Sequence, residues 1–144
     1  MRTTSNSVLV PASPAAVWAV LTDPALTRSC LLGLAVESTF AVGAQIAFRG
    51  PGGILLGGRV LAHDRDELLS HSLGDLCPDL VRAGLEEHDP SCWVTWTAEV
   101  VSEEPPVTRV GLTVDLFDPD EETCTAWSDA LEGLARVLEA TQSG

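Results

Sequence analysis

The sequence of 144 residues contains no lysine and no tyrosine, and all eight of its basic residues are arginine. Without lysine, the chain cannot form a Schiff base with a carbonyl substrate or hold a nucleotide through a phosphate-loop lysine. Without tyrosine, it has no phenol to act as a general acid. These two absences exclude enzymes that depend on a lysine Schiff base, a phosphate-loop lysine or a tyrosine general acid. The arginine-only basic set, together with the frequent alanine and glycine, indicates a GC-rich bacterial source.

The sequence lacks a C-x-x-C pair, and its four cysteines are scattered. We therefore expect reduced thiols and a cytoplasmic protein. A zinc site built from His71, Cys77, His88 and Cys92 would match no standard zinc motif. No G-x-S-x-G or H-E-x-x-H motif is present either. The sequence predicts no metal, no cofactor and no catalytic residues.

Long hydrophobic runs and positive charge are also lacking. The apolar stretch "VLVPASPAAVWAVL" is interrupted by Pro11 and Pro14, and Asp23 follows before the stretch could span a bilayer. It also does not resemble an export signal. The net charge of -13 repels nucleic-acid phosphates and anionic membrane surfaces. We therefore expect neither a nucleic acid nor a membrane as a partner.

The composition is that of a folded chain. Hydrophobic residues make up 45% of the sequence and charged residues 20%, which is too apolar for a disordered chain. A chain of this length can bury one sizeable core. No linker or internal repeat divides it, so the prediction is a single domain over residues 1–144.

The amino-terminal part predicts one strand and two short helices. Residues 7–10 are short and β-branched, as in a strand. Ser13 is a good N-cap before Pro14, which suits the first position of a helix. Asp23 and Pro24 repeat this signal, and the second helix is expected to end near Cys30.

Between Leu34 and Leu116 the apolar pattern has the period of two that is typical of strands, and glycine-rich turns interrupt it. We expect about six antiparallel strands there. The stretch "RGPGGILLGGRV" is interpreted as a hairpin rather than a phosphate cradle, because neither a helix nor a lysine follows it. The clearest strands place two sets of residues on their inner faces: Cys92, Val94, Trp96, Ala98 and Val100, and Val110, Leu112, Val114 and Leu116.

Two further helices are predicted. A short inserted helix or lid is expected within residues 77–90, "CPDLVRAGLEEHDP". A long helix is expected from Pro119 to about Thr141, with an apolar face formed by Trp127, Leu131, Leu134 and Leu138. Gly133 lies in its middle, where glycine costs about 1 kcal/mol relative to alanine. This glycine is explained either by helix packing or by the close approach of a strand or ligand.

Three stretches together resemble a known superfamily: "ASPAAVWAVLTDP", "GGRVLAHDRDELLSHSL" and "WSDALEGLARVLEA". Their order and spacing are similar to those of the START-like (SRPBCC) superfamily. The closest resemblance is to the family that includes the carboxyl-terminal domain of the ATPase activator of the ninety-kilodalton heat-shock chaperone. The resemblance implies an α+β helix-grip fold: a curved antiparallel sheet of about seven strands around a long carboxyl-terminal helix, with two short helices after the first strand. The chain departs from the family pattern at Ser29, Cys30 and His71, where aromatic residues are usual.

The resemblance also implies an apolar cavity between the sheet and the last helix. The residues expected to line it are Phe48, His71, Leu73, Trp96, Leu112, Trp127, Leu131 and Leu134. Alternation places His71 on the same face as Leu69 and Leu73. This histidine is interpreted either as a core residue with a backbone or water partner or as a hydrogen-bonding group for a ligand.

Three functions are compatible with this pattern. The first is non-catalytic binding of a small hydrophobic molecule, such as a lipid or an aromatic natural product. The second is a chaperone-cofactor role with a protein partner, the chaperone or a second copy of the chain. The third is an enzyme similar to the polyketide cyclases or aromatases. The absence of catalytic motifs favours the first.

Overall fold

The computed structural model describes residues 2–30, 33–50, 55–75, 92–116 and 121–143. The predicted inserted helix within residues 77–90 lies outside these ranges. The elements are β1 (Arg2–Val10), α1 (Pro14–Thr22), α2 (Pro24–Cys30), β2 (Ala35–Ser38), β3 (Gln45–Arg49), β4 (Leu55–Asp64), β5 (Leu68–Asp75), β6 (Cys92–Glu103), β7 (Pro106–Leu116) and α4 (Glu121–Ser143).

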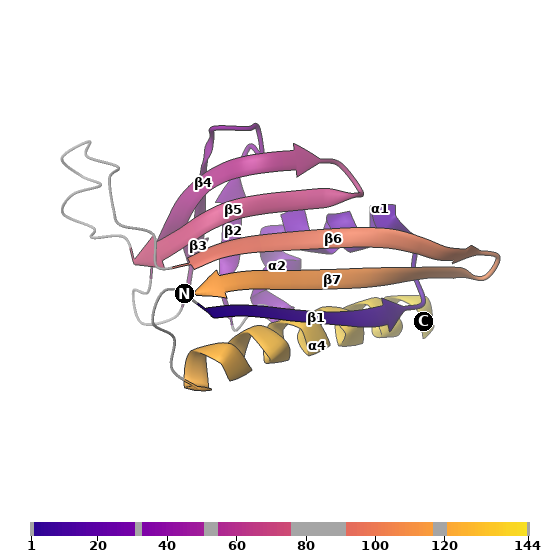
Figure 1. Cartoon of the computed structure of the whole chain (residues 1–144). Helices are drawn as coiled ribbons and strands as arrows, with labels where there is room; N and C mark the ends of the chain where they lie inside the picture. Colours follow the sequence, from indigo (N-terminus) through magenta and orange to yellow (C-terminus); the bar gives the residue numbers. More distant parts are fainter. Residues whose placement is uncertain (1, 31–32, 51–54, 76–91, 117–120, 144) are drawn as a thin grey trace.

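The strands form one antiparallel sheet of seven strands in the order β1-β7-β6-β5-β4-β3-β2. The sheet is curved, and Figure 1 shows α1 and α2 behind it and α4 running beside β1. Two short helices follow the first strand, and a long helix follows the last. The predicted α+β architecture is therefore confirmed.

The first strand is longer than predicted. It begins at Arg2 rather than Ser7 and pairs with β7 along its whole length. Thr3 and Ser5 lie on the face opposite to buried Val10, where Thr3 donates a hydrogen bond to Asp115 and the hydroxyls of Ser5 and Thr113 are 3.1 Å apart. Thr4 and Asn6, on the face of Val10, are polar too. Such a segment has no apolar alternation to reveal it.

The first helix is capped as the sequence predicts. The Ser13 hydroxyl accepts a hydrogen bond from the backbone N–H of Ala16, and Pro14 occupies the first turn. The helix buries Val17, Trp18, Val20 and Leu21. The second helix spans Pro24–Cys30 as predicted, and the Asp23 carboxylate accepts from the backbone N–H groups of its first turn.

Alternation along β6 and β7 places apolar side chains in the interior, as predicted. Val94, Trp96, Val110, Leu112 and Val114 are all buried. Val100 differs, because it is 50% exposed near the end of β6, where the pairing with β7 shifts register. The core is therefore formed by the central part of these two long strands.

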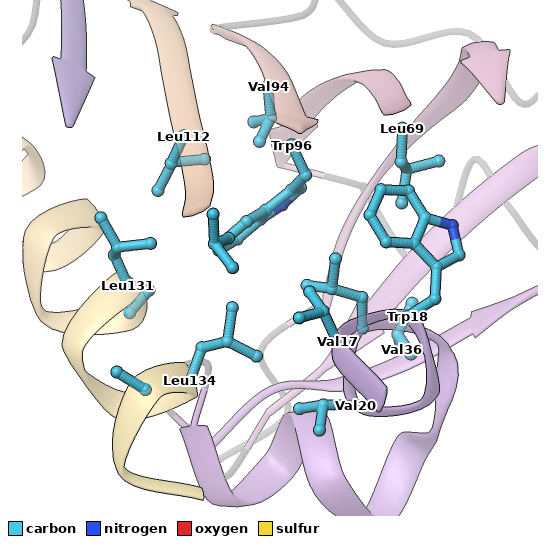
Figure 2. Packing of buried hydrophobic residues seen from close by; sticks show 14 of the residues in the cluster. Val17, Trp18, Val20, Val36, Leu69, Val94, Trp96, Leu112, Leu131 and Leu134 are labelled. Carbon is cyan, nitrogen blue, oxygen red and sulfur yellow. The ribbon is translucent and has the colours of Figure 1, made fainter. Parts of the chain in front are cut away.

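Helix α4 covers one side of this core. It spans Glu121–Ser143, whereas the sequence predicts a start at Pro119, which lies outside the described ranges. Leu131, Leu134 and Leu138 are buried and Trp127 is half-buried, so the predicted apolar face is confirmed. The helix packs mainly against β1 and α2. Figure 2 shows Trp96 extending from the sheet toward the side chains of this helix.

Candidate functional site

The eight predicted pocket residues all belong to or pack against one buried cluster. Seven of them are at most 7% exposed, and Trp127 is half-buried against the cluster. The sheet contributes Phe48, His71, Leu73, Trp96 and Leu112, and α4 contributes Trp127, Leu131 and Leu134. The two sets come from opposite walls of the interior.

Within this cluster the residues divide between two ends of the sheet. His71 on β5 is paired with Val60 of β4 and Val94 of β6, and its ring lies 5.6 Å from that of Phe48 on β3. Leu112 lies on β7, the strand next to β1, along which α4 packs. Trp96 on β6 pairs with Leu112 and lies between the two groups.

Among the described buried residues, His71 is the only histidine, acidic or basic residue. It is 1% exposed, and its Nδ1 lies 2.9 Å from the carbonyl oxygen of Ser72. A carbonyl oxygen can only accept, so Nδ1 carries the proton and donates it. In the neutral ring Nε2 is then a hydrogen-bond acceptor, and it has no hydrogen-bond partner among the residues that the structure describes.

The environment keeps this imidazole uncharged. Burial lowers the pKa of His71 from 6.5 to about 4, although the hydrogen bond to Ser72 opposes the shift. Desolvation acts in this direction because it penalises the charged ring. At neutral pH the interior therefore contains a neutral acceptor beside the aromatic face of Phe48.

The other buried polar side chains are fully used by the fold. The Thr27 hydroxyl donates to the carbonyl of Pro24 and accepts from the N–H of Val36. The Thr108 hydroxyl donates to the carbonyl of Ala12 at 2.7 Å. Both threonines therefore connect backbone segments. Among the described residues, Oδ1 of Asp66 at the β4–β5 turn is a buried atom without a hydrogen-bond partner, and Nε2 of His71 is the unused lone pair on the inner face of the sheet.

A hydrogen-bonded group around a second histidine, His63, was not predicted from the sequence. The indole N–H of Trp18 donates to Nε2 of His63 at 3.0 Å, and Nδ1 of His63 donates to the carbonyl of Phe40 at 2.9 Å. Simple alternation from Val60 would point His63 outward. The register shift between Val60 and Ala62 turns it inward, and this bulge has no signal that we recognise in the sequence.

Metal ligation has no support in the part of the chain that the structure describes, where no group of three or more His, Cys, Asp or Glu side chains could hold an ion. Cys77 and His88 of the rejected zinc grouping lie outside that part. Among the described helices, none is long and apolar enough to cross a membrane.

No family model and no curated protein matches this chain. Solved structures do match. A protein of Mesorhizobium loti is 23% identical with a TM-score of 0.73, and the match covers 97% of this chain and 98% of the other. A protein of Cytophaga hutchinsonii is 22% identical with a TM-score of 0.72, covering 100% and 98%.

A third solved structure is described as the Aha1 dimer from Colwellia psychrerythraea. It is 18% identical with a TM-score of 0.70, and the match covers 96% of this chain and 97% of the other. At these identities the likeness establishes a shared fold.

Proposed function

We propose that this protein, which has the START-like helix-grip fold, binds a small hydrophobic molecule between its curved sheet and α4 without transforming it. The observation that carries the proposal is the unused Nε2 of His71 in an interior whose other described buried side chains are apolar or are threonines hydrogen-bonded to the backbone. Ligand sites are typically apolar with a few polar groups that orient the ligand. A buried acceptor that no described residue satisfies is a group of this kind.

The hydrogen bonds of the described histidines favour binding over catalysis. A histidine that activates a nucleophile is hydrogen-bonded to a hydroxyl or thiol. His63 instead bonds to the Trp18 indole and the Phe40 carbonyl, and His71 bonds to the Ser72 carbonyl. Neither ring activates a nucleophile among the described residues. We place this binding protein in the cytoplasm, as its thiol content indicates.

The proposal is tested with the hydrocarbon probe diphenylhexatriene. We expect its fluorescence to rise on mixing with the protein, and tryptophan emission to be quenched, because Trp96 lies in the interior. Extraction of the purified protein with organic solvent, followed by mass spectrometry, identifies what it carries from the cell. No saturable probe binding and no co-purified molecule would overturn the proposal.

A second candidate is a chaperone-cofactor-like interaction module. The sequence resembles the activator family, and a solved structure of the same fold is an Aha1 dimer. In this case the partner is the chaperone or a second copy of the chain. Capture of purified ninety-kilodalton chaperone, and light scattering of the protein alone, test these two partners separately.

A further inference from the structure

The hydrogen bonds around His71 restrict the chemistry of any ligand that reaches it. Nδ1 donates to the Ser72 carbonyl at 2.9 Å, so the proton of the neutral ring is already committed. Nε2 then offers a lone pair and no proton. A ligand group that meets this atom must bring a proton of its own.

The charges around the interior give a second restriction. The arginines whose side chains the structure describes, Arg28, Arg49, Arg59, Arg65, Arg109 and Arg136, are all exposed. Among the residues whose burial the structure describes, the buried polar side chains are His71 and two threonines whose hydroxyls already hydrogen-bond to the backbone. A carboxylate in this interior would lose its hydration and find no described cation to replace it.

We infer that the ligand is a neutral, largely apolar molecule whose hydroxyl or N–H group donates a hydrogen bond to Nε2 of His71. This inference rests on the proposed function and specifies its ligand class. It selects alcohols and phenols over fatty-acid anions of similar size. Phe48, whose ring is 5.6 Å from the imidazole, is placed to contact the apolar body of the ligand beside its donor.

Three matched probes test the inference by equilibrium dialysis at neutral pH: 2-naphthol, 2-methoxynaphthalene and 2-naphthoate. The hydroxyl of 2-naphthol is a hydrogen-bond donor. In 2-methoxynaphthalene a methyl ether replaces this hydroxyl, and 2-naphthoate is an anion. We expect naphthol to bind about tenfold more tightly than the methyl ether, which is the usual net value of one hydrogen bond. Naphthoate should bind most weakly of the three.

Variants assign the preference to one residue. His71→Leu removes the acceptor, so naphthol and its methyl ether should then bind equally. His63→Leu is the matched control, because both ring nitrogens of His63 are already hydrogen-bonded. The control should keep the tenfold preference. Nitrogen-15 NMR of the wild type, with a shift of the His71 Nε2 signal on addition of naphthol, provides a test that depends on no variant.

The outcomes separate the two proposals. If the methyl ether binds as tightly as naphthol and the His71 Nε2 signal does not move, the inferred ligand class is wrong while hydrophobic binding stands. Tighter binding of naphthoate would likewise overturn it. If neither diphenylhexatriene nor any naphthalene probe binds, the proposed function fails, and the inference about its ligand fails with it.

Discussion

The indole N–H of Trp18 donates to Nε2 of His63 across 3.0 Å, with the two rings parallel to within 3°. This hydrogen bond joins α1 to β4, two elements that the sequence separates by more than thirty residues. His63 also links β4 to the segment before β3, because its Nδ1 donates to the carbonyl of Phe40. Phe40 itself has a left-handed backbone with φ of 61°, which is uncommon for a residue with a side chain.

We expect Trp18→Phe to destabilise the protein by about 2 kcal/mol, since it leaves Nε2 of His63 without its donor. Urea unfolding of Trp18→Phe, His63→Leu and the double variant measures the coupling, which should be about 1 kcal/mol. Trp93→Phe is the control, because no hydrogen bond of the Trp93 indole to a described residue is seen. Strictly additive effects would show that the bond adds nothing.

His71 predicts a specific dependence of stability on pH. Its pKa is about 4 in the folded protein and 6.5 when exposed, so the unfolded chain binds the proton more tightly. Its contribution is complete above pH 6.5 and is lost as the pH falls toward 4, by about 3 kcal/mol in total. His71→Leu removes this pH-dependent contribution. The contributions of the other titrating groups are the same in both proteins, so they cancel in the difference between the two pH profiles. Parallel profiles of unfolding free energy between pH 7 and 4 would contradict the assignment.

Glycine 58 is required where β4 approaches β5. A Cβ atom built on Gly58 would collide with the backbone carbonyl of Ser72, the same carbonyl that accepts from His71. We expect Gly58→Ala to cost about 3 kcal/mol and to shift the NMR signal of His71 Nδ1. Gly111→Ala is the matched strand substitution, where the new atom meets only the Thr97 hydroxyl at 2.5 Å. Since that side chain can rotate, a cost of about 1 kcal/mol or less is expected there. Equal costs measured by urea unfolding would refute the distinction.

Leu131→Trp distinguishes a ligand cavity from a solid core. Leu131 is 4% exposed on α4 and is one of the predicted pocket residues. A cavity accepts the added volume, so the variant should fold and lose diphenylhexatriene binding, whereas a close-packed core is strained by it. Circular dichroism and probe titration read the two effects separately. Glu132→Trp, on the exposed side of the same helix, controls for the added indole. An unfolded Leu131→Trp, together with no probe binding to the wild type, would favour the interaction module.

The interior was predictable because burial imposes periodicity. Period-two alternation correctly placed Trp96 and Leu112 on the inner face, and helical spacing did the same for Leu131 and Leu134. The sequence also placed His71 beside Leu69 and Leu73, which the structure confirms.

What the sequence did not reveal depends on pairing between distant segments. The start of β1 is polar on both of its faces, so its hydropathy does not reveal that it pairs with β7. His63 was missed because one register shift reverses the faces of β4. The tautomer of His71 is set by the hydrogen bond from its Nδ1 to the backbone carbonyl of Ser72. Every residue has a backbone carbonyl, so the amino-acid sequence does not show which one accepts this bond.

The pairing of β1 with β7 also has a consequence for how the molecule is made. Arg2 pairs with Leu116 and Val10 with Thr108, so about a hundred residues separate the partners. During synthesis β1 leaves the ribosome about a hundred residues before its neighbour β7, and it remains unpaired on that side until β7 has emerged. Contacts of such long sequence separation slow folding, because a large loop must close before they form. A nascent chain that stops before residue 106 therefore exposes an unpaired strand edge, and we expect it to depend on chaperones until β7 has been synthesised.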